Sequence, residues 1–187
     1  YVDLPLQHAH DAVLRSMNRP DTREGVEKLI KRLRERIPGV AIRSTFIVGF
    51  PGETDTHYQA LRSFVEAQRF DKVGIFTYSE EEDTPAAKMA QKVPEEVMQE
   101  RYHDLMSLQS KISEEINVSL EGKEVDVLIE GRDEEQEGIS IGRSYREAPE
   151  VDGQIYIESD TESRVGDIAR VRLLQGFTYD IVGEKVH

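Results

Sequence analysis

The first part of the chain alternates short apolar runs with amphipathic stretches. Alternating or near-continuous apolar residues predict strands over residues 1–7, 40–50 and 72–79. Apolar positions at helical spacing predict helices over residues 11–17, 21–39 and 54–69. The second half of the second strand is almost continuously apolar, so we expect this strand to be buried on both faces. This order of elements predicts an α/β fold with a parallel sheet, either open or closed into a barrel.

The pattern changes twice after the third strand. A polar loop follows, and Pro94 begins a long amphipathic helix that fades near Gly122. Short segments rich in β-forming residues then predict strands over residues 124–131, 138–145, 153–159, 167–175 and 178–186. Five short strands within about 65 residues are typical of a small antiparallel β-barrel. We expect two domains, residues 1–119 and 120–187.

Candidate ligand-binding residues follow from the parallel sheet. Ligands collect at the carboxyl ends of parallel strands. Three stretches meet this condition, namely residues 7–10, residues 48–53 and the chain from Tyr78 onward. We therefore expect these stretches to lie near one another.

The turn "FIVGFPGET" is the most distinctive of these stretches. It is neither a phosphate-binding Walker loop nor the dinucleotide fingerprint, because its glycine spacing fits neither. Gly49 removes a side chain at the strand end, so a flat ligand could approach the backbone there. Gly52 can supply a positive φ, and Glu53 begins the next helix. The alternative is an ordinary β-to-α turn.

Other polar residues near the strand ends have two interpretations each. Arg43 lies in an apolar strand and needs an anion, which could be a ligand or a neighbouring carboxylate. Gln7 has the same ambiguity at the end of the first strand. His8 and His10 are two residues apart, a spacing that can suit a metal, but no third ligand is evident.

Charge and composition narrow the classes of partner. Residues 120–187 hold 8 Lys and Arg against 17 Asp and Glu, a net charge of −9 in a chain whose net charge is −13. This balance argues against non-specific nucleic-acid binding and suits a basic partner, or it is simply a solvated acidic surface. This region also contains four aromatic residues, Tyr145, Tyr156, Phe177 and Tyr179. Because the region is acidic, we expect them to pack in the core or to contact a protein rather than to stack on bases. No apolar run is long enough to span a membrane.

Three long motifs carry a resemblance to a known family. "YVDLPLQHAHDAVLRSMNRPDT", "IRSTFIVGFPGET" and "VPEEVMQERYHDLMSLQSKIS" closely resemble the radical S-adenosylmethionine methylthiotransferases. "IGRSYREAPEVDG" is similar to the branch that modifies ribosomal protein S-twelve, rather than the tRNA-modifying branch. The resemblance implies the later half of a radical SAM, TIM-like α/β barrel, a long connecting helix and a TRAM β-barrel. Because the chain starts in mid-strand, we expect a fragment.

The resemblance also implies a set of cofactor-binding residues. Val48 and Gly49 would lie against the adenine of S-adenosylmethionine, with Tyr78 nearby. Phe50, Gly52 and Glu53 would complete that wall of the pocket. Gln7 and Arg43 would face the methionine moiety or the barrel interior.

This chain departs from the pattern of the family, whose members hold two [4Fe–4S] clusters. The clusters are held by cysteines, and this chain contains none. We assign no catalytic residue and no metal ligand here. We therefore expect this chain to be inactive on its own.

The implied activity is methylthiolation of the β-carbon of an aspartate in ribosomal protein S-twelve, in the cytoplasm. The acidic TRAM-like domain would dock that basic protein, with no nucleic acid or membrane as partner. Exposed barrel edges would allow self-association. The alternatives are a tRNA-modifying methylthiotransferase and a non-catalytic protein-interaction module.

Overall fold

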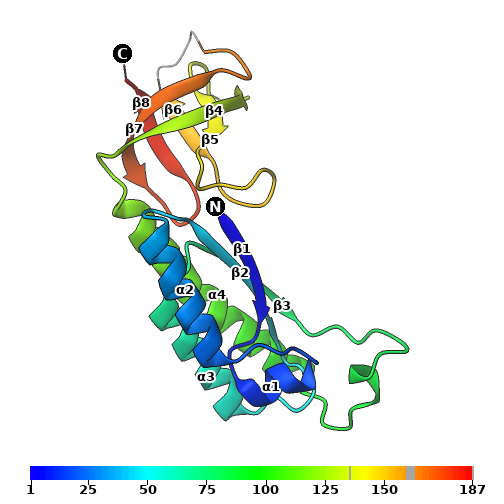
Figure 1. Cartoon of the computed structure of the whole chain (residues 1–187). Coiled ribbons are helices and arrows are strands. Elements are labelled where there is room, and N and C mark those ends of the chain that lie inside the picture. Colours follow the sequence, from blue (N-terminus) through cyan, green and yellow to red (C-terminus); the bar gives the residue numbers. More distant parts are fainter. Residues whose placement is uncertain (135, 159–162, 187) are drawn as a thin grey trace. The chain divides into compact units, whose positions relative to one another are not determined.

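A computed structural model describes residues 1–134, 136–158 and 163–186 of the chain (Figure 1). The chain divides into two compact units, Val2–Gln109 and Ser110–His187, and Tyr1 groups with the second. The division lies inside the long helix α4 (Glu95–Val118), whose end is close to the expected domain boundary between residues 119 and 120. That boundary stays a prediction, and each unit is described by itself.

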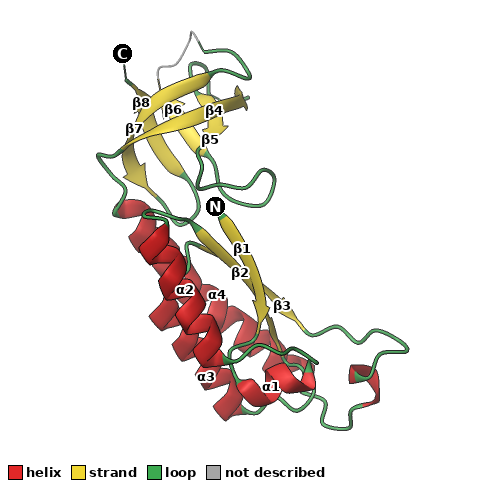
Figure 2. Cartoon of the chain, viewed as in Figure 1, coloured by secondary structure: helices red, strands yellow, loops and turns green. Residues whose placement is uncertain are grey.

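The first unit contains a parallel sheet with the strand order β1-β2-β3. Its strands are β1 (Val2–Gln7), β2 (Ile42–Val48) and β3 (Lys72–Thr77), and its helices include α1 (Asp11–Ser16), α2 (Arg23–Arg36) and α3 (Asp55–Gln68). Figure 2 shows α2 and α3 along one side of the three strands. The predicted order of strands and helices is confirmed, with the carboxyl ends of all three strands at one edge.

Side chains immediately before the helices fix where they begin. Thr22 accepts a hydrogen bond from Gly25 N at the start of α2, and Thr54 forms a reciprocal capping box with His57 at the start of α3. His10 Nδ1 accepts from Ala12 N and caps α1. These caps satisfy amide donors that the first turn of a helix leaves without partners.

One face of β2 forms the core of this unit. Phe46 lies there in edge-to-face contact with Phe64 of α3 and with Phe70, at ring-centroid distances of 6.3 and 5.8 Å. The residues that alternate with this face, Arg43, Thr45 and Ile47, are only partly buried. The expectation that β2 is buried on both faces is therefore wrong for one face.

The second unit contains a closed barrel of five strands in the order β4-β5-β6-β8-β7. Its strands are β4 (Glu124–Arg132), β5 (Ser140–Arg143), β6 (Ile155–Glu158), β7 (Ile168–Gly176) and β8 (Ile181–Lys185). Four pairings are antiparallel and β6–β8 is parallel, which the sequence pattern did not predict. Residue 159, the last of one predicted strand, lies outside the described residues.

Inward-facing aliphatic residues fill this barrel. Val127, Ile157 and Val171 are completely buried, and each comes from a different strand. β7 alternates exposed and buried positions along most of its length, as a strand with one face toward a core must. Among the described residues, no helix is long and apolar enough to cross a membrane.

Candidate functional site

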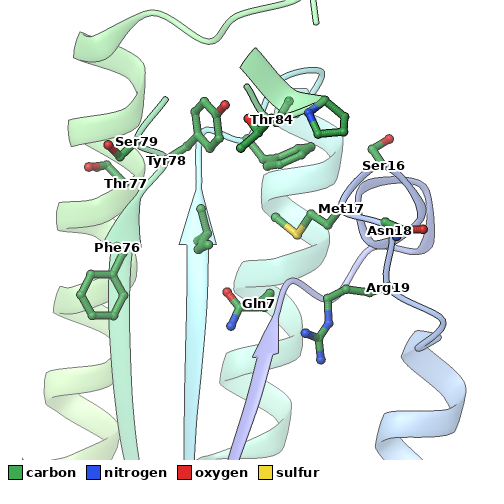
Figure 3. Close-up of a pocket in the computed structure, with 14 residues that line it drawn as sticks. Gln7, Ser16, Met17, Asn18, Arg19, Phe76, Thr77, Tyr78, Ser79 and Thr84 are labelled. Atoms are coloured by element: carbon green, nitrogen blue, oxygen red, sulfur yellow. The ribbon is translucent and has the colours of Figure 1, made fainter. Parts of the chain in front are cut away.

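A cavity of about 650 Å³ lies at the carboxyl ends of the three parallel strands, within the size range of small-molecule sites (Figure 3). Gln7 ends β1, Phe50 follows β2 and Tyr78 follows β3, and all three line the cavity. Residues 16–19, at the end of α1 and just after it, and residues 84–86 of the polar loop complete its walls. The short β-to-α and α-to-β connections place these segments together because the strands are parallel.

Two aromatic rings form one side of the cavity. Phe50 and Tyr78 meet edge to face, with ring centroids 5.4 Å apart. The Tyr78 hydroxyl is buried and has no hydrogen-bond partner among the described residues. A buried hydroxyl without a partner is costly, and a polar group of a bound ligand would satisfy it. Aromatic rings beside a hydroxyl without a partner suit a planar ligand with polar edges, such as adenine.

The polar loop beside the cavity is held by Lys92. Its ammonium group donates to Ala86 O at 3.1 Å and Ala87 O at 2.9 Å, in the 3₁₀ turn η1 (Ala86–Lys88). It also pairs with Glu80 and lies 5.8 Å from the Tyr78 ring centroid. Lys92 thus fixes both the loop wall and the aromatic wall.

The turn after β2 is closed by its own glutamate. Glu53 Oε2 accepts from Gly49 N at 3.1 Å, and Gly52 N donates to Gln91 O at 2.7 Å. Gly49 and Gly52 have φ angles of +78° and +87°, which glycine adopts without strain. Met98 of α4 occupies the space that a side chain on Gly49 would need.

A buried polar cluster lies behind this turn. Arg101 of α4 donates to Glu53 Oε1 at 2.7 Å and to Asp55 at 2.6 Å. His8 Nε2 lies 3.2 Å from Glu53 Oε2, and the side chains of His8 and Glu53 are fully buried. His10 N donates to His8 Nδ1 at 3.0 Å, so neutral His8 carries its proton on Nε2.

Tyr58 and His10 are two residues of this unit whose pKa values are shifted. Burial, followed by the hydrogen bond to Asp104, raises the pKa of Tyr58 well above its usual value. Burial and the neighbouring His57 and His8 rings lower the pKa of His10. Neither residue lines the cavity, so we relate both shifts to the stability of the fold rather than to ligand chemistry.

Three of the eight residues expected at a cofactor site line the cavity, namely Gln7, Phe50 and Tyr78. Val48 and Gly49 are buried, and they do not line it. Their contact with a ligand stays a prediction.

The other three expected residues have protein partners. Arg43 donates to Asp3 at 2.9 Å on the partly exposed side of the sheet, so its anion is a neighbouring carboxylate, one of the two predicted alternatives. Gly52 and Glu53 shape the turn rather than the cavity wall. Their roles toward a ligand also stay predictions.

The sequence reasoning did not find Met98, Arg101 or Lys92. Arg101 lies 48 residues from Glu53 along the chain, so no local spacing marks the pair. Met98 and Lys92 similarly resemble ordinary helix and loop residues. Only the folded chain brings them to the turn and to the cavity.

Iron–sulfur ligation does not fit the residues of this chain. The sequence has no cysteine, and thiolates are the ligands that such clusters take. Among the described residues there is no group of three or more side chains that could hold a metal ion. His8 and His10 are instead engaged in the polar cluster and in capping α1.

Paired charges cover part of the barrel surface. Arg170 donates to Asp126 at 3.1 Å, and Arg172 donates to Glu124 and to Glu184 at 3.2 Å each. The hydrogen bond to Asp126, the largest cause, raises the pKa of Arg170. These arginines therefore offer little unneutralised positive charge to a phosphate backbone.

Most aromatic residues of the barrel are on its surface. Tyr145, Phe177 and Tyr179 are 54%, 44% and 48% exposed, so the core alternative is wrong for these three. Tyr156 is partly buried. Exposed aromatic side chains leave protein contact or base stacking as their remaining roles.

Comparison with known proteins gives the family. Residues 1–65 match the radical SAM superfamily, and residues 122–186 match the TRAM domain. The sequence is 52% identical, over 186 residues and 100% of the chain, to the ribosomal protein uS12 methylthiotransferase RimO of Heliobacterium modesticaldum. The chain belongs to the radical SAM methylthiotransferase family. It covers 40% of that relative's length.

Other relatives and a solved structure agree with this family. RimO proteins of Trichormus variabilis and Geobacter sulfurreducens are 50% and 47% identical over 100% and 98% of the chain, which covers 42% and 41% of their lengths. The solved structure of the radical SAM enzyme coproporphyrinogen III oxidase (HemN) from Escherichia coli has a TM-score of 0.52 at 16% identity. It is matched over 92% of this chain and 40% of its own, and at that identity it supports the fold alone.

Proposed function

We propose that this chain forms part of a radical SAM methylthiotransferase that acts on ribosomal protein uS12. The observation that carries the proposal is the 45–52% identity to RimO proteins over 98–100% of the chain. The modified position would be the β-carbon of an aspartate, in the cytoplasm where ribosomal proteins act. The chain spans about two fifths of its relatives' lengths, so it would supply one part of the enzyme.

In this proposal the α/β unit supplies a wall of the S-adenosylmethionine pocket. Phe50 and Tyr78, which form one aromatic side of the cavity, would pack against the adenosyl group, and the Tyr78 hydroxyl would gain a partner. Gln7 would orient a polar part of the same ligand. When bound, S-adenosylmethionine would supply radical chemistry for removing hydrogen from an unactivated carbon. The thiolates for an iron–sulfur cluster would come from outside this chain.

The barrel would dock the basic ribosomal protein. The region of this chain that contains the barrel, residues 120–187, has a net charge of −9, and carboxylates neutralise Arg170 and Arg172. Complementary charge accelerates encounter and orients the partners. A tRNA-modifying enzyme would instead need unpaired cations along its nucleic-acid surface.

Affinity measurements over a range of salt concentrations test the docking proposal. The chain is expected to bind purified uS12 more tightly than tRNA, with an affinity that falls as salt rises. A double Glu137→Gln, Glu150→Gln variant, which changes two exposed barrel residues, should weaken uS12 binding. A double Glu35→Gln, Glu66→Gln variant removes the same charge from α2 and α3 and should have less effect.

The same measurements separate the competing functions. Tighter binding to tRNA than to uS12 would contradict the proposal and favour a tRNA-modifying methylthiotransferase. Calorimetry with S-adenosylmethionine separates both enzymes from a non-catalytic interaction module, which would not bind it. The isolated chain should bind the cofactor weakly and catalyse nothing, and methylthiolation by this chain alone would overturn the assignment of its role.

A further inference from the structure

Glu53 is the centre of a buried cluster that joins three parts of the α/β unit. Its carboxylate accepts from Gly49 N at 3.1 Å, from His8 Nε2 at 3.2 Å and from Arg101 at 2.7 Å. The side chains of Glu53 and His8 are fully buried, and that of Arg101 is 6% exposed. These donors come from the turn itself, from the residue after β1 and from α4.

The cluster lies directly beside two cavity residues along the chain. Gln7, which precedes His8, has φ = +69°, and the β1–β2 register shifts between Leu4 and Gln7. A non-glycine residue in this left-handed region persists only where its surroundings impose the conformation. Phe50 follows Gly49, and its carbonyl accepts from Glu53 N at 2.8 Å.

We propose that His8, Glu53 and Arg101 are positioning residues that place Gln7 and Phe50 on the cavity. None of the three lines the cavity, so they act through the backbone on either side of it. The ligand assumed here, S-adenosylmethionine, rests on the proposed function, but the placement of Gln7 and Phe50 is measurable without any ligand.

Removing Arg101 should move the turn. The Glu53 carboxylate would remain buried with its cationic partner gone, which is a strongly unfavourable arrangement. It can recover only by reaching solvent or another donor, and either movement shifts Gly49 N and the Phe50 carbonyl. Because His8 shares the same carboxylate, Gln7 should move as well.

The first experiment compares Arg101→Met with Arg62→Met in the ligand-free chain. Arg62 donates to Asp104 at 3.0 Å and therefore also joins α3 to α4, but its partners lie outside the turn. NMR is expected to show shifted Gln7 and Phe50 resonances in Arg101→Met, with amide exchange at Gly49 faster by about tenfold. Arg62→Met also removes a contact with α4, but it should leave the Gln7 and Phe50 resonances and the exchange rate at Gly49 unchanged.

The second experiment titrates each variant with S-adenosylmethionine and follows the Gln7 and Phe50 resonances. Arg101→Met and Glu53→Gln should each weaken affinity by about tenfold, the order expected for displaced contacts, whereas Arg62→Met should not. Should Arg101→Met fail to fold, Arg101→Lys and Glu53→Gln provide the same comparison.

The outcomes separate this inference from the proposed function. Unchanged Gln7 and Phe50 resonances in Glu53→Gln and in the Arg101 variants would overturn the positioning role, as would equal changes in Arg62→Met. A wild-type chain that ignores S-adenosylmethionine, with ligand-free shifts still present in the cluster variants, would overturn the cofactor pocket and support the positioning cluster.

Discussion

Met98 of α4 lies against the backbone of Gly49, in the place where a side chain would stand. A Cβ on Gly49 would lie 2.2 Å from Met98 Cγ and 2.5 Å from Met98 Sδ. Gly49 also has φ = +78°, a conformation that favours glycine. Backbone conformation and packing therefore select glycine here independently, before any ligand is considered.

Gly49→Ala should lower the free energy of unfolding by about 1–3 kcal/mol, because it adds strain at positive φ and overpacks the contact with Met98. Urea denaturation followed by circular dichroism measures the change. In a double-mutant cycle with Met98→Ala, the contact part of the loss should be recovered and the backbone part should remain. Full recovery would contradict the backbone part of this explanation, and no loss in Gly49→Ala would contradict both parts.

Tyr58 should make the α/β unit sensitive to alkaline pH. Its pKa is raised in the folded state, so its stabilising contribution is present below about pH 10 and is lost as pH rises further. Tyr58→Phe should flatten this decline and, by removing the 2.6 Å hydrogen bond to Asp104, cost about 1 kcal/mol at neutral pH. Unfolding free energies from pH 7 to 11 test both effects. Tyr102→Phe is the matched control and should keep the decline.

Lys92→Met should loosen the loop that forms one cavity wall. The substitution keeps most of the length of the side chain but removes the donors to Ala86 O and Ala87 O and the pairing with Glu80. Hydrogen exchange over residues 80–92 should become faster by about tenfold, while global stability changes by less than about 1 kcal/mol. Lys88→Met, in the same loop, serves as the control. Equal exchange in the two variants would show that Lys92 does not hold the loop.

Two glycines of the second unit should differ in how strongly they respond to substitution by alanine. A Cβ on Gly153 would lie 2.0 Å from Tyr179 O, a backbone atom that cannot move cheaply, whereas Gly131 has nothing within 4 Å. Gly153→Ala should destabilise the barrel by about 2–3 kcal/mol, and Gly131→Ala should change its stability by less than about 0.5 kcal/mol. Thermal unfolding of the two variants gives the comparison. Similar midpoints would refute the packing at Gly153.

Local periodicity was sufficient to locate most elements of this fold. Apolar spacing predicted β1, β2 and β3 and the helices between them, because side-chain direction repeats every two residues in a strand and every 3.6 in a helix. The same rule could not reveal that one face of β2 is only partly buried, since burial depends on what lies against it. It also missed the parallel β6–β8 pair, because pairing direction is set by closure of the barrel.

Some residues of the candidate site could likewise be predicted from the sequence, and others could not. Gln7, Phe50 and Tyr78 follow from the sequence once the strands are known to be parallel, since their carboxyl ends share one edge. Arg43 was left with two alternatives, and its pairing with Asp3 is a contact across 40 residues that no pattern marks.

The sequence by itself determined the elements, their parallel order, the acidic barrel and the edge of the sheet where a ligand would bind. Each of these depends on nearest neighbours, repeat spacing or composition. Only the tertiary structure decided that Glu53 is buried between His8 and Arg101 and that Met98 covers Gly49. Those relationships depend on where α4 packs, and side chains about 50 residues apart meet only when the chain has folded.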